Sequence, residues 1–248
     1  MDNPVTDNAL SNLQKDIASR SGGDLRREDF TPERIDAYRA FMAAQGHTVS
    51  FLSPEEREAS RQAFLTDHVP GEDLWLFGYG SLMWNPAVET LGAERASIDG
   101  FSRAFALTLA FGRGTPDRPG LMLVLLEGQG CTGLAHRIPA DKVDSETQVL
   151  WLREMLSGAY RPVWQEMRFA DRRSQRGLVF VANAGHPRVE ANLPFETIAQ
   201  RVALAEGALG TNRDYLYKCE AIMAEHNIAD PMITQLARRV REICAGEP

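Results

Sequence analysis

Cysteine is scarce in this chain. Only three of the 248 residues are cysteines, Cys131, Cys219 and Cys244. An odd and widely spaced set cannot form a complete disulfide framework, and it is typical of reduced thiols in a cytosol. We therefore expect a cytoplasmic protein whose fold depends on its core rather than on covalent cross-links.

Long apolar runs and a surplus of basic residues are missing as well. No stretch approaches the roughly 18 consecutive apolar residues of a membrane helix, and the first residues lack the basic start and apolar core of a secretory signal. Lysine and arginine total 27 against 34 aspartate and glutamate residues, which gives a formal charge of −7. A broad nucleic-acid surface needs concentrated positive charge. The sequence thus predicts neither a membrane span nor a nucleic-acid partner.

The common metal-binding motifs do not occur. The five histidines are scattered, and the chain contains neither an HExxH nor a Cys-x-x-Cys pattern. A Cys131–His136 catalytic pair is conceivable, but both residues would lie on one apolar strand, where a buried structural cysteine is the commoner outcome. We expect no metal and no cofactor.

Helix signals dominate the first 70 residues. Residues 1–25 are polar and suggest a loose terminal arm. Thr31-Pro32-Glu33 is typical of a helix start and Gly46 of its end. Ser53-Pro54-Glu55-Glu56 has the capping-box pattern and predicts a second helix to about Asp67. We expect an N-terminal helical extension over 1–70 and an α+β domain over 71–248.

The pattern changes at Leu74 to short apolar runs that glycine and proline separate. Such runs predict buried strands, which we place at Leu74–Phe77, Phe105–Ala110, Leu121–Leu126, Thr132–Ile138 and Leu178–Ala182. Helices are predicted from about Ser145 to Leu156, from Pro194 to near Gly210, from a cap at Asn212, and from Asp230-Pro231 towards Cys244. Strands and helices mixed in this way indicate an α+β fold.

A glycine loop, Phe77-Gly78-Tyr79-Gly80-Ser81-Leu82, follows the first predicted strand. Two glycines around a tyrosine allow a sharp turn and a close approach of the backbone to a ligand. Several N–H groups can then point into one concavity, which suits an anion or a developing oxyanion. A tight turn without any ligand would explain the same spacing. A dinucleotide fingerprint and a nucleophile elbow both fail, because each needs a glycine where Met83 stands.

Five short segments follow one another in a distinctive order. They are FGYGSLMWNP from Phe77 to Pro86, RGTP from Arg113, GLAHR from Gly133, LREM from Leu152 with GAY from Gly158, and NRDYL from Asn212. Together they closely resemble the signature segments of the ChaC family of γ-glutamylcyclotransferases. The resemblance extends over roughly 74–245 and leaves 1–70 outside. Five ordered segments are far more specific than one glycine loop.

The resemblance implies a fold, a reaction and site residues. The fold would be a small mixed β-barrel with helices packed around it, and 71–248 would be the catalytic domain. The reaction would cyclise the γ-glutamyl group of glutathione to 5-oxoproline and release Cys-Gly. Glu154 would be the catalytic acid and base. The loop, with neighbours that could assist it, gives these substrate-binding candidates: Leu76, Phe77, Gly78, Tyr79, Gly80, Ser81, Leu82, Arg113, Tyr160 and Tyr215.

Glu154 suits proton transfer even without the resemblance. On the predicted helix it lies three and four residues after Trp151 and Leu150, so it shares a face with them. A carboxyl group against an indole and a leucine is partly desolvated, which raises its pKa. The competing interpretation is a surface glutamate, or one that is paired with Arg153 or Arg161.

Three of the candidates and the exact substrate stay open. Tyr160, beyond a break at Gly158, could reach back to the site, and Tyr215 could offer its hydroxyl. Arg113 could pair with a carboxylate, although an arginine beside glycines is as often solvated. Other γ-glutamyl peptides or amines are alternative substrates, and a binding module without turnover is the alternative function. The extension could serve a homodimer or another partner in each case.

Overall fold

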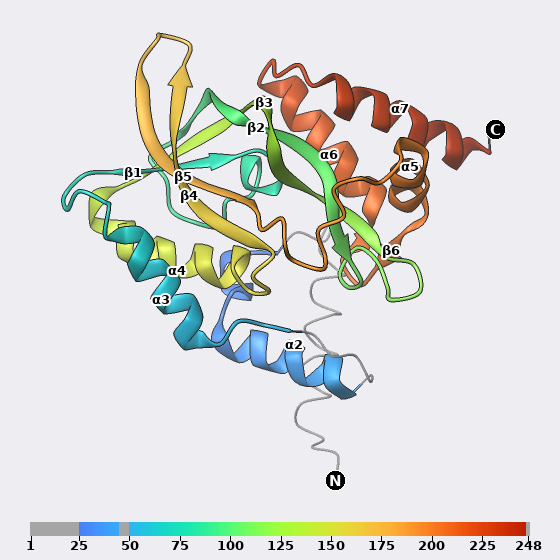
Figure 1. Ribbon diagram of the computed structural model, residues 1–248, viewed down its shortest axis with the longest axis horizontal. Helices are drawn as coiled ribbons and strands as arrows, with labels where there is room; N and C mark the ends of the chain where they lie inside the picture. Colours follow the sequence, from blue (N-terminus) through green and yellow to red (C-terminus); the bar gives the residue numbers. More distant parts are fainter. Residues whose placement is uncertain (1–24, 45–49, 247–248) are drawn as a thin grey trace.

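The protein forms a closed β-barrel with helices packed around it, as its computed structural model shows (Figure 1). The structure describes residues 25–44 and 50–246. The barrel strands are β1 (Leu74–Gly78), β2 (Ala93–Leu109), β3 (Gly120–Ile138), β4 (Tyr160–Phe169) and β5 (Ser174–Ala182), in the order β1-β3-β2-β4-β5. Neighbours are antiparallel except β1 and β5, which run parallel and close the barrel. The predicted α+β barrel of mixed strand direction is confirmed.

The long strands β2 and β3 differ from their prediction. Leu121–Leu126 and Thr132–Ile138 are two parts of β3, so the predicted break between them was wrong. A Cβ at Gly128 would collide with Ser102, whose hydroxyl accepts the Gln129 amide at 3.1 Å. These glycines therefore hold β3 close to β2 beside a register shift, instead of ending the strand.

The helix α4 (Val143–Glu154) follows β3 close to its predicted position, and three helices form the C-terminal part. They are α5 (Phe195–Leu204), α6 (Asn212–Glu225) and α7 (Pro231–Ala245). The predicted end of α5 near Gly210 was wrong, because a short hairpin of β6 (Glu206–Gly207) and β7 (Gly210–Thr211) intervenes. Asp230 caps α7 as predicted by accepting the Ile233 amide at 3.2 Å.

Asn212 has a different role from the predicted cap. The cap of α6 is Thr211, whose hydroxyl accepts the Asp214 amide at 3.2 Å. The buried Asn212 amide instead bonds both backbone groups of Leu121, at 2.7 and 2.8 Å. Asn212 therefore pairs with the start of β3 as a neighbouring strand would, and it fixes α6 against the barrel.

The N-terminal part contains a 3-10 turn, η1 (Arg27–Asp29), and the helices α2 (Pro32–Ala44) and α3 (Pro54–Leu65). The predicted capping box is confirmed, since Ser53 accepts the Glu56 amide and Glu56 accepts the Ser53 amide at 2.7 Å. The predicted stop at Gly46 and the arm before residue 25 lie outside the described residues. Figure 1 places α2 and α3 below the barrel, with α3 beside α4.

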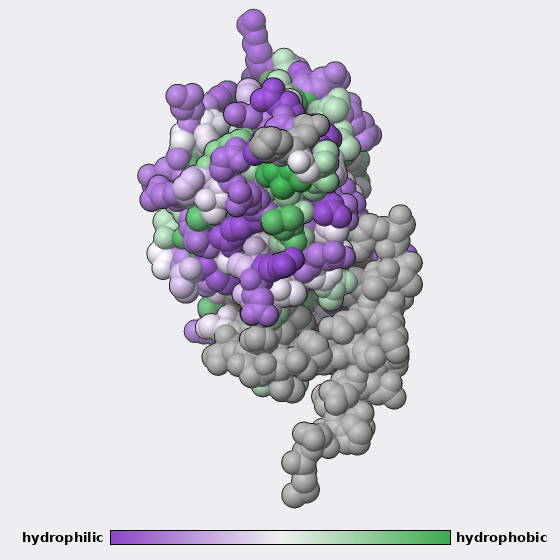
Figure 2. All heavy atoms as spheres, turned by 90° about the vertical axis from the view of Figure 1, so that its right-hand side faces the viewer, coloured by the Kyte–Doolittle hydropathy of each residue, from purple (hydrophilic) through white to green (hydrophobic). Residues whose placement is uncertain are grey.

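Two clusters of buried side chains form the core. The first fills the barrel and continues between α5, α6 and α7. The second lies between the barrel, α4 and α3, and includes Phe64 and Trp151 with ring centroids 5.5 Å apart. Figure 2 shows the face over α5 and α7, where hydrophilic residues prevail and apolar ones form only small patches. The apolar sides of these helices therefore face inward.

Membrane association and disulfide bonding can be examined for the described ranges. None of their helices combines the length and apolar character that a bilayer crossing requires. Cys131, Cys219 and Cys244 are free thiols, and the first two are buried.

Candidate active site

The glycine loop leaves β1 at Gly78 and leads into a second 3-10 turn, η2 (Ser81–Met83). A Cβ at Gly78 would lie 2.9 Å from the carbonyl carbon of Leu82, and a Cβ at Gly80 would lie 2.7 Å from the Tyr215 hydroxyl. Real side chains do not make contacts this close, so Gly78 requires glycine, and a side chain at Gly80 would displace the Tyr215 hydroxyl. The loop backbone is thereby packed directly against α6.

Arg153 joins the loop to Glu154. Its Nη2 donates to the Ser81 hydroxyl at 2.9 Å, and its Nε donates to Glu154 Oε1 at 2.7 Å. Nη1 donates to the carbonyl of Asn85, just beyond η2. The side chains of Arg153 and Glu154 are only 9% and 12% exposed. One guanidinium therefore fixes the positions of the carboxyl and the loop relative to each other.

Glu154 ends α4 and lies where its carboxyl is largely removed from water. Burial raises its pKa above the usual range, and the charge and hydrogen bond of Arg153 oppose this shift in part. Both sequence interpretations are therefore realised together, since the carboxyl is desolvated and also paired with Arg153. Its raised pKa makes this carboxylate a better proton acceptor than an exposed glutamate, as general acid–base catalysis requires.

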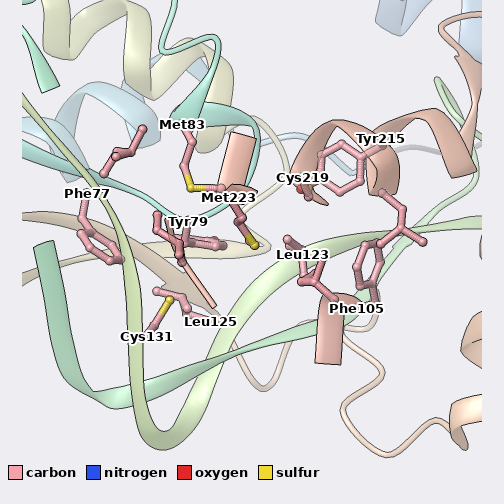
Figure 3. Close-up of a cluster of buried hydrophobic side chains, with 14 of the residues drawn as sticks. Phe77, Tyr79, Met83, Phe105, Leu123, Leu125, Cys131, Tyr215, Cys219 and Met223 are labelled. Carbon is pink, nitrogen blue, oxygen red and sulfur yellow. The ribbon is translucent and has the colours of Figure 1, made fainter. Parts of the chain in front are cut away.

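Two tyrosine hydroxyls lie near Glu154, and a third lies next to them. Tyr79 comes from the loop, Tyr160 from β4 and Tyr215 from α6, and all are buried. Burial raises the pKa of each phenol, and the nearby Glu154 charge raises those of Tyr79 and Tyr160 further. Figure 3 shows Tyr79 and Tyr215 in one buried cluster. The three phenols stay protonated at neutral pH and can donate hydrogen bonds.

Comparison with known proteins identifies the family. Residues 74–243 match the family model described as ChaC-like protein. The chain belongs to the ChaC-like family. The glutathione-specific gamma-glutamylcyclotransferase of Escherichia coli is 39% identical over 193 residues, which cover 78% of this chain and 84% of that protein. Glutathione-specific gamma-glutamylcyclotransferase 1 of Homo sapiens is 32% identical over 60% of this chain and 69% of its own length.

Solved structures support the fold of this ChaC-like chain. A crystal structure of a selenomethionine-labelled gamma-glutamyl cyclotransferase specific to glutathione from yeast superposes with a TM-score of 0.64 at 20% identity. The superposition covers 69% of this chain and 96% of the yeast chain. The yeast protein therefore has no counterpart for nearly a third of this chain.

The structure places the sequence-predicted residues in three groups. Glu154, the loop from Gly78 to Ser81, and Tyr160 and Tyr215 lie together around the position just described. Leu76, Phe77 and Leu82 point into the two core clusters and are at most 5% exposed. Arg113 is buried at the start of α6, where it donates to the Thr211 carbonyl at 3.0 Å. The roles of all these residues in binding or catalysis stay predictions.

Two arginines of this region were not among the predicted site residues. Arg153 appeared in the sequence only as an alternative partner of Glu154, and Arg103 did not appear at all. Arg103 of β2 donates to the Tyr79 carbonyl at 2.7 Å, to the Thr132 carbonyl and to Asp230 at 3.0 Å. For Arg153, the one sequence feature that could have indicated a role in the site is its position directly before Glu154. Arg103 has no local motif, because its partners come from distant parts of the chain.

The Cys131–His136 pair is contradicted. The two residues lie an odd number of positions apart on a regularly paired part of β3, so they point to opposite faces. Burial also raises the pKa of the Cys131 thiol to about 11 and lowers that of the His136 imidazole to about 4. Within the ranges that the structure describes, no three His, Cys, Asp or Glu side chains are placed to hold a metal ion.

Proposed function

We propose that this ChaC-like protein cyclises the γ-glutamyl group of glutathione to 5-oxoproline and releases Cys-Gly. The E. coli and human relatives carry the name of this activity, and the first is 39% identical to this chain. The observation that carries the proposal is the bridge from Glu154 through Arg153 to Ser81. It puts a desolvated carboxyl beside the glycine loop that the family resemblance assigns to the γ-glutamyl group.

The reaction requires one proton acceptor and a fixed substrate geometry. The α-amine nitrogen of the glutamyl group attacks its own γ-carbonyl carbon and forms the lactam C–N bond. Glu154 takes one proton from the ammonium, which frees the lone pair for the attack. As the bond from the γ-carbon to the cysteine nitrogen breaks, Glu154 delivers that proton to the cysteine nitrogen. The second proton that the ring nitrogen must lose follows by the same route, so the lactam keeps one N–H and Cys-Gly leaves as an ammonium. No water and no redox partner is consumed.

The loop supplies the remaining contributions. Holding the amine against the carbonyl makes the attack unimolecular, which can remove several kcal/mol from the barrier. Backbone N–H groups between Gly78 and Ser81 are suited to stabilise the oxyanion or to hold the α-carboxylate. The Tyr160 hydroxyl donates to the Leu123 carbonyl at 3.2 Å, so it could donate to a substrate oxygen only by giving up that bond.

Incubation with glutathione tests the proposal. Mass spectrometry should detect 5-oxoproline and Cys-Gly in equal amounts with the wild-type protein, and at least about 100-fold less of both in the same time with Glu154→Gln. Lactam from another γ-glutamyl peptide or amine, but not from glutathione, would assign the same chemistry to a different substrate. Binding of γ-glutamyl compounds without any lactam would indicate a non-catalytic module and contradict the proposal.

Location and assembly belong to the same proposal. A reduced cytoplasm would supply glutathione and suits the three free cysteines. We retain a cytoplasmic location, a small-molecule substrate and a homodimer as predictions, to be tested by cell fractionation, by substrate titration and by light scattering of the purified chain.

A further inference from the structure

The helix that carries Glu154 is contacted by the N-terminal segment, residues 25–44 and 50–65, which precedes the region matched by the family model. At the start of α4, Arg27 donates through both Nη atoms to Glu146, whose side chain is 1% exposed. At its end, the Leu52 amide donates to the Leu156 carbonyl at 2.9 Å. The segment therefore follows α4 along its whole length.

The helix α3 adds contacts in the middle of α4. Trp151 donates its Nε1 to the Ser60 hydroxyl at 3.2 Å. Arg61, with a side chain only 2% exposed, donates to Asp144 at 2.8 Å and to Thr147 at 3.0 Å. Because the Arg61 guanidinium is buried, breaking its bonds to α4 would leave its N–H groups unpaired, which favours this one arrangement. Figure 1 shows α2 and α3 beneath α4.

One residue of the segment touches the candidate active site directly. The Phe30 ring lies under the Arg153 guanidinium, with Cζ 5.5 Å from the ring centroid. The carbonyl of Leu25, at the start of the same segment, accepts the Asn85 side-chain amide at 2.6 Å, and the Asn85 carbonyl accepts Nη1 of Arg153. The guanidinium carbon thus lies over the Phe30 ring, while the N–H groups bond Glu154, Ser81 and Asn85.

The geometry points to Phe30 as a positioning residue that holds Arg153 on Glu154 and Ser81, so that the N-terminal segment completes the active site. This inference rests on the proposed function for its catalytic meaning. A cation over an aromatic face gains about 0.5–1 kcal/mol at partly exposed sites. The gain is large enough to favour one orientation of a long arginine side chain.

The groups around Glu154 set its pKa, and this pKa can be measured to test the inference. Arg153 of α4 faces the carboxyl, as do the phenols of Tyr79 from the loop and Tyr160 from β4. Arg153 is the cation among them and lowers the pKa of Glu154, while burial raises it. If the ring is lost and Arg153 moves away, the pKa of Glu154 should therefore rise.

A titration of Glu154 in full-length variants tests this directly. Glutamate is labelled with ¹³C at Cδ, and Glu154→Gln assigns the signal. We expect Phe30→Ala and Phe30→Leu to raise the pKa of Glu154 and to lower kcat by about 3-fold, since about 0.5–1 kcal/mol is lost. Phe30→Tyr keeps the ring and should match the wild type. Asp36→Ala, on an exposed part of α2, is the matched control.

The outcomes separate a positioning role from a purely structural one. The inference is supported if the pKa of Glu154 rises in Phe30→Ala and Phe30→Leu but not in Phe30→Tyr or Asp36→Ala. An unchanged pKa in Phe30→Leu overturns it, even if that variant is less stable. The titration needs no turnover, so it gives an answer even if glutathione proves not to be the substrate.

Discussion

Two arginines hold the glycine loop from opposite sides, and each pairs with a carboxylate. On the side of α7, Arg103 bonds the Tyr79 carbonyl and Asp230. On the side of α4, Arg153 bonds the Ser81 hydroxyl and Glu154. Both arginines are nearly buried, at 3% and 9% exposure. The pairs are alike in chemistry and burial, yet we infer that only one takes part in the reaction.

The carboxylates explain the difference. Asp230 uses one oxygen for Arg103 and the other as the cap of α7, where it accepts the Ile233 amide. It is thus committed to joining a helix to the barrel. Glu154 ends its helix, and burial raises its pKa. Both oxygens of a structural carboxylate already accept hydrogen bonds, whereas a proton-transfer carboxylate needs an oxygen that can still accept a proton.

The largest expected difference concerns the rate. Glu154→Gln should fold normally and lose about 10²–10⁴-fold in kcat, the usual contribution of general acid–base catalysis. Glu166→Gln, at an exposed position of β4, is the matched control and should keep the wild-type rate. Steady-state kinetics of 5-oxoproline release measures both. Near-normal turnover in Glu154→Gln would contradict the catalytic role that distinguishes Glu154 from Asp230.

The second effect concerns stability. Arg103→Met should lower the free energy of unfolding by about 3 kcal/mol, because it leaves the Asp230 carboxylate and two buried carbonyls without their donor. Urea denaturation measures the change. The double variant with Asp230→Asn should recover part of the loss, since no unpaired charge remains. A loss of less than about 1 kcal/mol would show that this pair does not anchor the loop.

The third effect is smaller and falls on Arg153. Arg153→Lys keeps the charge, but an ammonium cannot reproduce the planar fork that serves Ser81, Asn85 and Glu154 together. We expect kcat to fall about 10-fold, which corresponds to about 1.4 kcal/mol, with a smaller loss of stability than in Arg103→Met. If Arg153→Lys instead unfolds more easily than Arg103→Met at an unchanged rate, the roles of the two arginines are reversed.

The smallest effect is a pH dependence of stability. The folded protein binds the Glu154 proton more tightly than the unfolded chain does, because burial raises the pKa. This carboxyl therefore destabilises the fold increasingly as pH rises from about 4.5 through the raised pKa. Glu154→Gln should gain stability over the wild type across that window. Thermal unfolding of both proteins at several pH values checks the sign, and a constant difference would contradict it.

Local sequence patterns predicted much of this site. Gly78 is fixed by contacts with its near neighbours Leu82 and Met83, and the helical spacing of Glu154 predicted a desolvated carboxyl, which is what the structure has. Asn212 shows where such reasoning fails, because its asparagine suggested a cap, whereas its amide pairs with Leu121 of β3. Only the folded barrel brings those two residues together.

The other missed features also depend on distant contacts. Arg103 meets Asp230 only after β2 and α7 have packed, so no motif marks the pair. The strand β4 was not predicted, because charged and exposed positions alternate with its apolar ones. The support of α4 by Arg27 and Phe30 comes from a segment outside the family resemblance. These interactions connect parts of the chain whose proximity the sequence does not reveal.

A crystal structure with bound 5-oxoproline tests the central claim most directly, namely that the loop and Glu154 form one active site. The account predicts the lactam against the backbone of Gly78–Ser81, with its ring nitrogen facing the Glu154 carboxyl. Density for the lactam elsewhere, for example in the groove that Met223 and Ile233 line between α6 and α7, would contradict it.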